Sequence, residues 1–312
     1  MKITADSYRI AILGGTGFAG RNVRVELESA GMCVETFSRT TGCDLLDLST
    51  AWAKLDAFRP THIVNLAAHV GSVNFVSDFA ADVVDVNMRI LLNLYKIAEH
   101  MRDTIIINPI ANCAFPGILN VYEEASFWSG PIHPSVLSYG STRRMIDVLS
   151  HCYSNQYGVR SSNVFVPNMY GPFDSTNPNK THALNALVIK FVRAKKENAP
   201  EVEVWGTGKP IREWLYVKDF ARIVRILIEA KDKILSPINI AQNHGLSVDD
   251  LVAIICKQLD YEGAIRKNTK YQDGSPKKVM DDTLFRQWFP DFSFTPFSEG
   301  LSDTITYYSD LL

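Results

Sequence analysis

The sequence predicts an α/β fold, a doubly wound parallel sheet joined to a second, smaller α/β lobe. In the first half of the 312-residue chain, short and almost wholly apolar segments alternate with helical patterns. A glycine-rich turn directly follows the first of these segments, and after about residue 167 the alternation breaks up into loops rich in Pro, Asn, Gly and Ser. Strands that are apolar on both faces belong to parallel sheets covered by helices on two sides. The change after residue 167 indicates a separate lobe.

In the first half, five segments are predicted as strands: residues 8–13, 32–37, 62–66, 104–108 and 162–166. Helical patterns run from the glycine-rich turn to about Ala30 and from about Asp82 to His100. The longer pattern gathers its apolar side chains on one side, as a helix that covers a sheet does.

In the second half, we expect helices over about residues 182–196, 217–230 and 247–259, and a strand over 237–240. Ser247 is the expected N-cap of the last helix, with Asp250 three positions further on. Residues 168–180 and 205–210 are expected to be loops, because both are rich in turn-forming residues.

Composition excludes several classes of protein. The net charge of −2 and the pI of about 6.4 give no basic surface for nucleic acid. No apolar run reaches the roughly 20 residues that span a bilayer, and residues 1–6 lack the apolar core of a signal peptide. Five cysteines without a CxxC pair argue against disulfides or a metal site. We therefore expect a soluble cytosolic protein that contacts neither membrane nor nucleic acid.

The glycine-rich turn has the spacing of a dinucleotide-binding site. Gly14, Gly17 and Gly20 follow the first predicted strand and open a helix. Glycines at this spacing allow a tight turn, close approach of the backbone to a pyrophosphate, and close packing of helix on strand. The phosphates would lie over the helix N-terminus, where free N–H groups attract anions. The alternative is a glycine-rich turn that serves only the fold.

The end of the second predicted strand favours NADP(H) over NAD(H). NAD-binding chains usually place an acid about 20 residues after the glycine turn, against the ribose 2′-hydroxyl. This strand ends instead in Phe37, Ser38, Arg39 and Thr40, of which Ser38 and Arg39 suit a 2′-phosphate. Asp44 follows, where a carboxylate can reach the adenine edge. We expect the dinucleotide-binding Rossmann domain to comprise residues 1–167 and 215–241, and the substrate domain residues 168–214 and 242–312.

Tyr139 and Arg143 form a second candidate pair. The local sequence reads as a helix, and a spacing of four places the phenol and the guanidinium on one helical face. A cation beside a phenol favours the phenolate, so the pair suits a general acid tuned toward neutral pH. By spacing alone, a tyrosine and an arginine four apart on a helix are more often surface partners than a catalytic couple.

Five further motifs, in order along the chain, carry a resemblance to a known family. They are Asn65–Gly71, Asn168–Pro172, His182, Val204–Trp214 and Asp273–Lys278. With the glycine turn at the start and Tyr139 in mid-chain, the sequence resembles the extended short-chain dehydrogenase/reductase family, which includes the NAD-dependent epimerases and dehydratases. Within that family it is most similar to the GDP-L-fucose synthases.

The resemblance implies a homodimeric enzyme with NADP on the first lobe and a GDP-linked sugar between the lobes. It implies that Cys113 and His182 invert the carbons beside a ketone, and that Tyr139 donates a proton when hydride reduces that ketone. The cofactor-binding positions that it implies are Gly14, Thr16, Gly17, Phe18, Gly20, Ser38, Arg39, Asp44, Leu45, Ala67, Ala68, Tyr139 and Arg143. The implied substrate-binding positions are Asn112, Asn168, Lys190, Trp205, Arg212 and Lys277.

Each of these assignments has a structural alternative. A free cysteine such as Cys113 is more often an inert buried thiol than a catalyst. His182 is also explained as the N-terminal cap residue of a helix, and Trp205 and Arg212 as packing within the small lobe.

The chain departs from the family pattern at two positions. Arg143 stands where the family has lysine, and Ala111 stands where it has serine or threonine, two residues before Cys113. Arginine supplies the same charge as lysine but cannot shed a proton at working pH. Loss of one hydroxyl donor to the ketone oxygen typically costs about 10²–10³ in rate. Asn112 is a candidate replacement for that donor.

Three functions are therefore weighed. The leading one is an NADP(H)-dependent epimerase/reductase that acts on a 4-keto-hexose nucleotide. The second is an epimerase with a weak or absent reductase step. The third is a non-catalytic NADP-binding member of the family.

Overall fold

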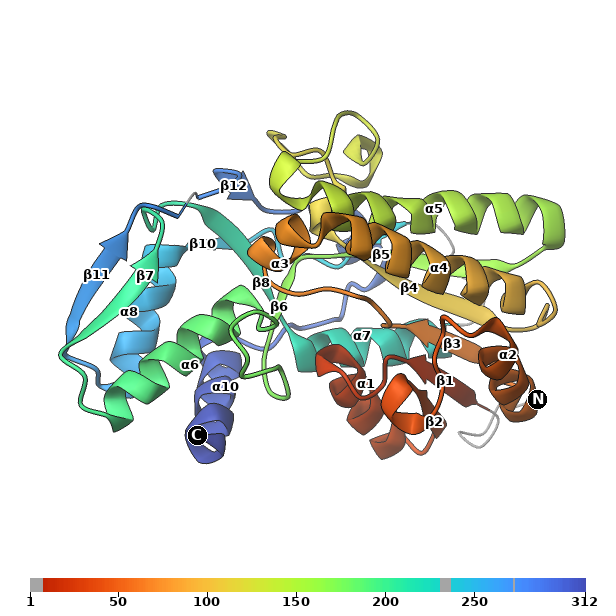
Figure 1. Ribbon diagram of the computed structural model, residues 1–312, viewed down its shortest axis with the longest axis horizontal. Coiled ribbons are helices and arrows are strands. Elements are labelled where there is room, and N and C mark those ends of the chain that lie inside the picture. Colours follow the sequence, from red (N-terminus) through yellow and green to blue (C-terminus); the bar gives the residue numbers. More distant parts are fainter. Residues whose placement is uncertain (1–7, 231–236, 272) are drawn as a thin grey trace.

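The structure is a computed structural model that describes residues 8–230, 237–271 and 273–312 (Figure 1). The prediction that residues 1–6 carry no signal peptide falls outside these ranges. No helix in the described ranges is long and apolar enough to cross a membrane.

A six-stranded parallel sheet forms the first lobe, with the strand order β2-β1-β3-β4-β5-β9. Its strands are β1 (Arg9–Leu13), β2 (Cys33–Phe37), β3 (His62–Asn65), β4 (Ile105–Ala111), β5 (Arg160–Val166) and β9 (Ile238–Asn239). The chain runs from β1 to β2 in one direction and from β3 to β5 in the other. The strand order therefore reverses between β1 and β3, where ligands of doubly wound folds bind. The predicted fold class is confirmed.

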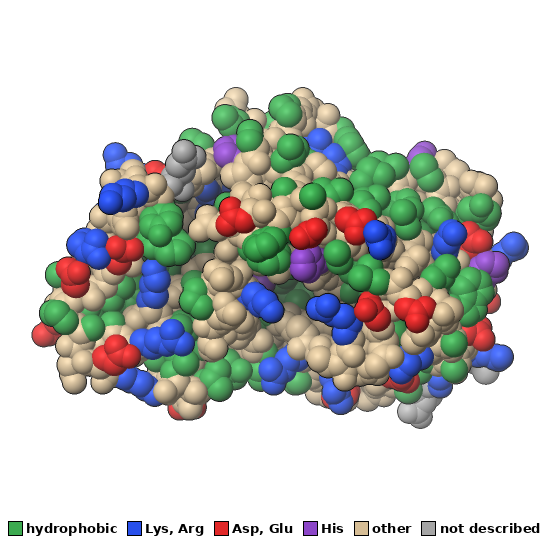
Figure 2. Space-filling model, in the orientation of Figure 1, with side chains coloured by type: hydrophobic (Ala, Val, Ile, Leu, Met, Phe, Trp, Pro, Cys, Tyr) green, Lys and Arg blue, Asp and Glu red, His purple; other side chains and the backbone are tan. Residues whose placement is uncertain are grey.

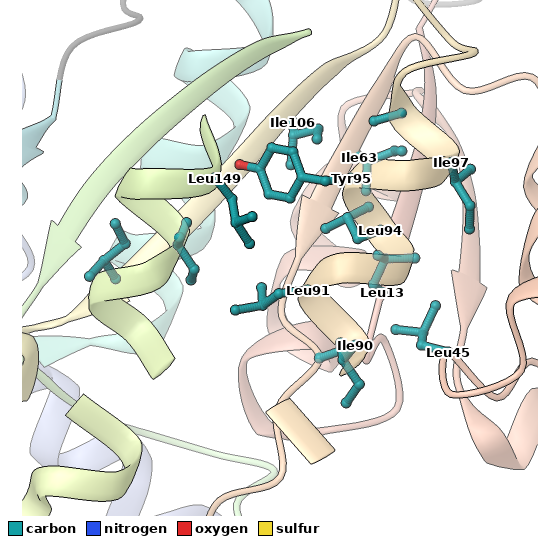
Figure 3. Close-up of a cluster of buried hydrophobic side chains, with 14 of the residues drawn as sticks. Leu13, Leu45, Ile63, Ile90, Leu91, Leu94, Tyr95, Ile97, Ile106 and Leu149 are labelled. Atoms are coloured by element: carbon teal, nitrogen blue, oxygen red, sulfur yellow. The ribbon is translucent and has the colours of Figure 1, made fainter. Parts of the chain in front are cut away.

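Helices cover both faces of this sheet. On the lower face in Figure 1 lie α1 (Phe18–Ser29) and α7 (Val217–Glu229), and the upper face carries α4 (Ala80–Ala98) and α5 (Leu137–Tyr157). The hydrophobic core on the upper face also includes side chains of α2 (Leu48–Phe58). Figure 3 shows other Leu and Ile side chains of this core packed around Tyr95. The short α3 (Val73–Asp78) precedes α4.

The second lobe has its own hydrophobic core beside the carboxyl ends of the first sheet (Figure 1). Its helices are α6 (Ala183–Lys196), α8 (Val248–Leu259) and α10 (Phe297–Leu311). β8 (Ile211–Tyr216) pairs with β6 (Asn168–Tyr170), β10 (Gly245–Ser247) and β12 (Lys277–Lys278), and β7 (Glu201–Trp205) pairs with β11 (Ala264–Asn268). Phe285 of α9 (Thr283–Trp288) packs instead in the lower core of the first lobe.

Every strand and helix predicted by range is present, with ends shifted by a few residues. Ser247 caps α8 in a reciprocal capping box with Asp250, as predicted. One expectation was wrong: residues 168–170 form β6 rather than part of a loop, because they pair with β8. Short 3-10 turns lie at Arg39–Thr41, Asn112–Ala114, Glu124–Ser126 and Pro134–Val136. The division of the chain into two domains at the predicted boundaries stays a prediction.

Candidate active site

The glycine turn is shaped for close approach of a ligand to the backbone. Gly14 has φ 74°, and a Cβ there would lie 2.7 Å from the carbonyl oxygen of Leu66. A Cβ on Gly20 would lie 2.4 Å from the carbonyl oxygen of Gly14. Gly17 is the N-cap of α1 and offers no side chain to cap the helix. The start of α1 therefore faces the switch point with main-chain donors, as a pyrophosphate requires.

Three hydroxyl groups gather above this turn. Thr16 donates to Ser38 at 3.2 Å, Thr40 donates to Thr16 at 3.1 Å, and the Ser38 and Thr40 hydroxyls lie 2.9 Å apart. Arg39 is exposed beside them and forms no ion pair with any described residue. Exposed hydroxyls and a free guanidinium suit a phosphate group.

The remaining cofactor positions differ in what they offer. Ala67 is buried and Ala68 half-buried, both directly after β3. Asp44 uses one carboxylate oxygen to accept the N–H of Leu46 at 3.0 Å. Leu45 packs in the upper core (Figure 3), and its carbonyl accepts from Asn93. The Leu45 side chain is therefore not available to a ligand.

Tyr139 and Arg143 lie together on α5, as their spacing predicted. The guanidinium carbon of Arg143 is 5.1 Å from the centroid of the Tyr139 ring, and Arg143 is only 3% exposed. Burial raises the pKa of Tyr139, and the charge of Arg143 only partly opposes this. The expected tuning toward neutral pH is thus outweighed, and the phenol stays protonated at neutral pH. A protonated phenol is a donor, the role that reduction of a ketone requires.

Asn87 on α4 holds Arg143 in place. Its Oδ1 accepts from Arg143 at 3.1 Å and from the N–H of His69 at 3.0 Å. The Nε of Arg143 is buried and has no hydrogen-bond partner within the described chain. A guanidinium with an unused donor fits a neighbouring ribose hydroxyl.

Cys113 lies beside Tyr139 because α5 packs directly on the 3-10 turn after β4. A Cβ on Gly140 would approach the carbonyl oxygen of Cys113 to 2.7 Å, so only glycine allows this contact. Burial raises the pKa of the Cys113 thiol, while the charges of Lys278 and then Arg143 lower it. The thiol therefore has two cations near it, which an inert buried cysteine would lack.

His182 is the N-cap residue of α6, but its side chain does not cap the helix. Its Nδ1 lies 3.0 Å from Oδ2 of Asp174, an oxygen that also accepts the His182 N–H at 2.8 Å. A carboxylate at Nδ1 fixes the proton there and leaves Nε2 as the basic nitrogen. The ring packs on Phe18 with centroids 5.1 Å apart, which places His182 next to the glycine turn. No contact joins His182 to Cys113 in the described part of the chain.

Four of the predicted nucleotide positions lie on elements of the second lobe: Lys190 on α6, Trp205 on β7, Arg212 on β8 and Lys277 on β12. Figure 2 shows Lys and Arg side chains on the surface of this lobe. Trp205 is 45% exposed, stacks on Tyr271 at 4.2 Å, and has Nζ of Lys190 4.5 Å from its ring centroid. Arg212 is half-buried and donates to the Asp273 carbonyl oxygen at 3.3 Å. Together these side chains offer cations and an exposed aromatic face, which suit a nucleotide diphosphate.

The remaining predicted substrate-binding residues, Lys277, Asn112 and Asn168, differ in their exposure and in their contacts. Lys277 is exposed, whereas the next residue, Lys278, is 7% exposed and acts on Cys113. Asn112 is buried, and its Nδ2 has no partner among the described residues. Asn168 makes only a 3.4 Å contact with the carbonyl oxygen of Glu213.

Residues 10–241 match the NAD dependent epimerase/dehydratase family. The chain belongs to this family. The matched residues include both the glycine turn and the helix that carries Tyr139. They end two residues after β9, the last strand of the first sheet.

Individual members of the epimerase/dehydratase family are similar to this protein over nearly its whole length. The GDP-L-fucose synthase of Escherichia coli (strain K12) is 30% identical over 318 residues, which covers 96% of this chain and 96% of the relative. That of Dictyostelium discoideum is 25% identical and covers 99% of this chain and 98% of its own. The crystal structure of a GDP-L-fucose synthetase from Naegleria fowleri bound to NADP is 25% identical, with a TM-score of 0.87 over 99% of this chain and 96% of the other.

Sequence reasoning missed several residues of this epimerase/dehydratase site. Asp174 follows the Gly171–Phe173 turn eight positions before His182, and an acid so near a candidate base is a usable signal. Asn87, a polar residue on the buried side of α4, is another such signal. Lys278 could be told from Lys277 only by knowing which face of β12 is buried.

Proposed function

We propose that this protein is an NADP(H)-dependent epimerase/reductase that acts on a GDP-linked 4-keto-hexose. The observation that carries the proposal is the cluster of Tyr139, Arg143, Cys113 and Lys278 at the carboxyl end of β4. This cluster combines a proton donor, a thiol base and two cations beside the switch point. The NADP-bound structure and the GDP-L-fucose synthases among its relatives support the choice of cofactor and nucleotide.

Epimerisation would use Cys113 and His182. A ketone at C4 acidifies the C–H bonds at C3 and C5. The Cys113 thiolate takes one of these protons, the electron pair of that bond moves into an enolate, and Nε2–H of protonated His182 returns a proton to the opposite face. A thiol and a neutral imidazole remain, and exchange with solvent resets both. Asp174 stabilises the imidazolium through Nδ1.

Reduction would use Tyr139. NADPH, when held by the glycine turn and Arg143, would supply the hydride for C4 of the ketone. Tyr139 then donates its phenolic proton to the developing alkoxide at O4, and Arg143 stabilises the phenolate that is left. Asn87 keeps the guanidinium in place for this step.

The direct test is to incubate the protein with GDP-4-keto-6-deoxymannose and NADPH in deuterated water. We expect NADPH consumption and deuterium at the carbons beside the ketone. Cys113→Ala should abolish the deuterium uptake while NADP binding is kept. Neither NADPH loss nor deuterium uptake with the GDP sugar, or with its dTDP-, CDP- and UDP-linked counterparts, would refute the proposal.

A second candidate is an epimerase with little or no reductase step. Ala111 favours it, because the last residue of β4 carries no hydroxyl for the ketone oxygen. Deuterium uptake without NADPH consumption would establish it. Tight NADP binding without turnover of any keto sugar would instead indicate the non-catalytic alternative.

We also propose a cytosolic homodimer. Val84 and Leu92 on α4 and Tyr157 on α5 are exposed apolar side chains on adjoining helices, and Figure 2 shows hydrophobic side chains on this part of the surface. Sedimentation equilibrium tests this directly, and a monomer at micromolar concentration would contradict it.

A further inference from the structure

A buried carboxylate ties the second lobe to the chain segments that leave the first. Glu213 on β8 is 0% exposed. Its Oε1 accepts the N–H of Gln242 at 2.5 Å, and its Oε2 accepts the N–H of Met280 at 2.9 Å. Gln242 lies between β9 of the first sheet and β10 of the second, and Met280 lies between β12 and α9. Glu213 therefore joins three segments at the place where each passes between the lobes.

The segments that Glu213 joins carry the cations of the site. Arg212 precedes it on β8, and Lys278 pairs with Arg212 in the parallel register of β12. Lys278 is buried, and its Nζ lies 5.8 Å from the centroid of the Tyr122 ring. It forms no ion pair with any described residue. A buried ammonium without a carboxylate partner is costly unless an anion faces it when the site works.

We propose that Glu213 is a positioning residue: by holding the main chain at Met280, its carboxylate fixes β12 against β8 and keeps Lys278 beside Cys113, where the ammonium stabilises the thiolate. The proposal rests on the proposed role of Cys113 as a base. The bond from Met280 anchors the strand two residues beyond Lys278, and the charge of Lys278 is the larger of the two cationic influences on Cys113.

An ionised acid suits position 213. Two main-chain N–H groups point at two different oxygens, and a carboxylate is a strong acceptor at both. Glutamine has the same shape but turns one –NH₂ group toward an N–H. Protonation of Glu213 weakens the pair of hydrogen bonds, because the oxygen that carries the proton loses negative charge and becomes a poorer acceptor.

The position of Lys278 should consequently depend on pH. Burial raises the pKa of Glu213 to about 7, with Asp282 adding to the rise and the main-chain hydrogen bonds opposing it. Among the other charges nearby, Arg212 interacts with Tyr122 and Asp273, and Lys278 with Cys113. As pH falls through about 7, Glu213 gains a proton and the hold on β12 weakens.

Stability should respond in the opposite direction. A carboxyl whose pKa is higher in the folded than in the unfolded chain stabilises the fold in its protonated form, and that contribution is lost as pH rises toward 7. Function and stability therefore respond oppositely to the same proton, which a purely structural carboxylate would not produce.

The test is the rate at which iodoacetamide alkylates Cys113, measured by peptide mass spectrometry on the full chain. The exposed Cys33 and Cys152 are internal references, and the buried Cys43 reports unfolding. We expect Glu213→Gln and Lys278→Met each to slow alkylation of Cys113 by about tenfold, since one pKa unit changes the thiolate fraction tenfold. Glu201→Gln, at an exposed carboxylate on β7 of the same lobe, is the matched control and should change nothing.

Alkylation of Cys113 at the wild-type rate in Glu213→Gln would overturn the proposal. If that variant exposes Cys43, Lys278→Met supplies the second measurement: alkylation of Cys113 at the wild-type rate in a folded Lys278→Met variant would overturn the proposal. Alkylation needs no sugar substrate, so a failed turnover assay refutes the proposed function without deciding this inference.

Discussion

Removing the two cations one at a time should separate the two half-reactions. Arg143 is the cation that acts on Tyr139, whereas Lys278 acts on Cys113 more strongly than Arg143 does. Arg143→Met should therefore slow reduction more than proton exchange, and Lys278→Met should do the reverse. Methionine removes the charge and the hydrogen-bond donors of both side chains while keeping an unbranched stem.

The magnitude for Arg143 follows from its distance to the ring. The guanidinium carbon lies 5.1 Å from the ring centroid, and a unit charge at about this distance from a phenolate is worth about 3 kcal/mol at an effective dielectric constant of about 20. If about half of that charge has developed when the proton is half transferred, the variant loses about 1.5 kcal/mol, or roughly tenfold in the reduction rate. Stability should change little, because Oδ1 of Asn87 still accepts the N–H of His69.

The assay follows NADPH absorbance and solvent-deuterium uptake in the same reaction. We expect the ratio of reduction to exchange to fall about tenfold in Arg143→Met and to rise in Lys278→Met. Arg143→Lys is the control, since it keeps the charge. Equal losses of both activities in both variants would show that the cations act on a shared element, such as the substrate diphosphate, and would refute this division of roles.

Three further predictions follow from local geometry. Gly20→Ala, whose Cβ would lie 2.4 Å from Gly14 O, should lower the melting temperature and weaken NADP binding, and an unchanged affinity would contradict the role of the turn. Arg39→Ala should weaken NADP about tenfold in fluorescence titration and leave NAD unchanged, and equal losses would count against 2′-phosphate binding. Burial opposes ionisation of Asp174, but hydrogen bonds, led by that from His182, hold the pKa of its carboxyl below the usual value. The stabilisation of the fold by the ionised Asp174 is therefore present above about pH 4 and is lost as pH falls further. Asp174→Asn should therefore cost about 1–3 kcal/mol in thermal unfolding at neutral pH and nothing in acid, and a pH-independent cost would exclude this origin.

The first lobe was predictable because the inner strands of its sheet are buried on both faces. Segments such as Ile105–Ile107 are apolar throughout, and a run of this kind between helical patterns has few other interpretations. The second lobe was harder, since β6, β10 and β12 are two or three residues long and exist only through their pairing with β8. Such pairing depends on residues far apart in the chain. The helix α2 was missed even though Asp47 caps it through the N–H groups of Ser49 and Thr50.

Spacing within one element predicted part of the site, and contacts between elements supplied the rest. Tyr139 and Arg143 share a helix, so their proximity followed from the sequence. Cys113 reaches them only because Gly140 lets α5 approach the turn after β4. The sign of the net pKa shift at Tyr139 was not predictable, since burial outweighs the neighbouring charge and burial cannot be read from spacing.

The two departures from the family pattern have different physical consequences. Arg143 keeps the charge beside Tyr139, and its hydrogen bond to Asn87 fixes the position of that charge. Ala111 removes a donor that no described side chain is seen to replace. The unpartnered Nδ2 of Asn112 is the nearest amide in sequence, but it is already buried and would have to turn toward the ketone. Ala111→Ser should therefore raise the rate of reduction while leaving deuterium exchange at Cys113 unchanged. An unchanged reduction rate would mean that Tyr139 alone provides the hydrogen bond to the ketone oxygen that the reaction needs.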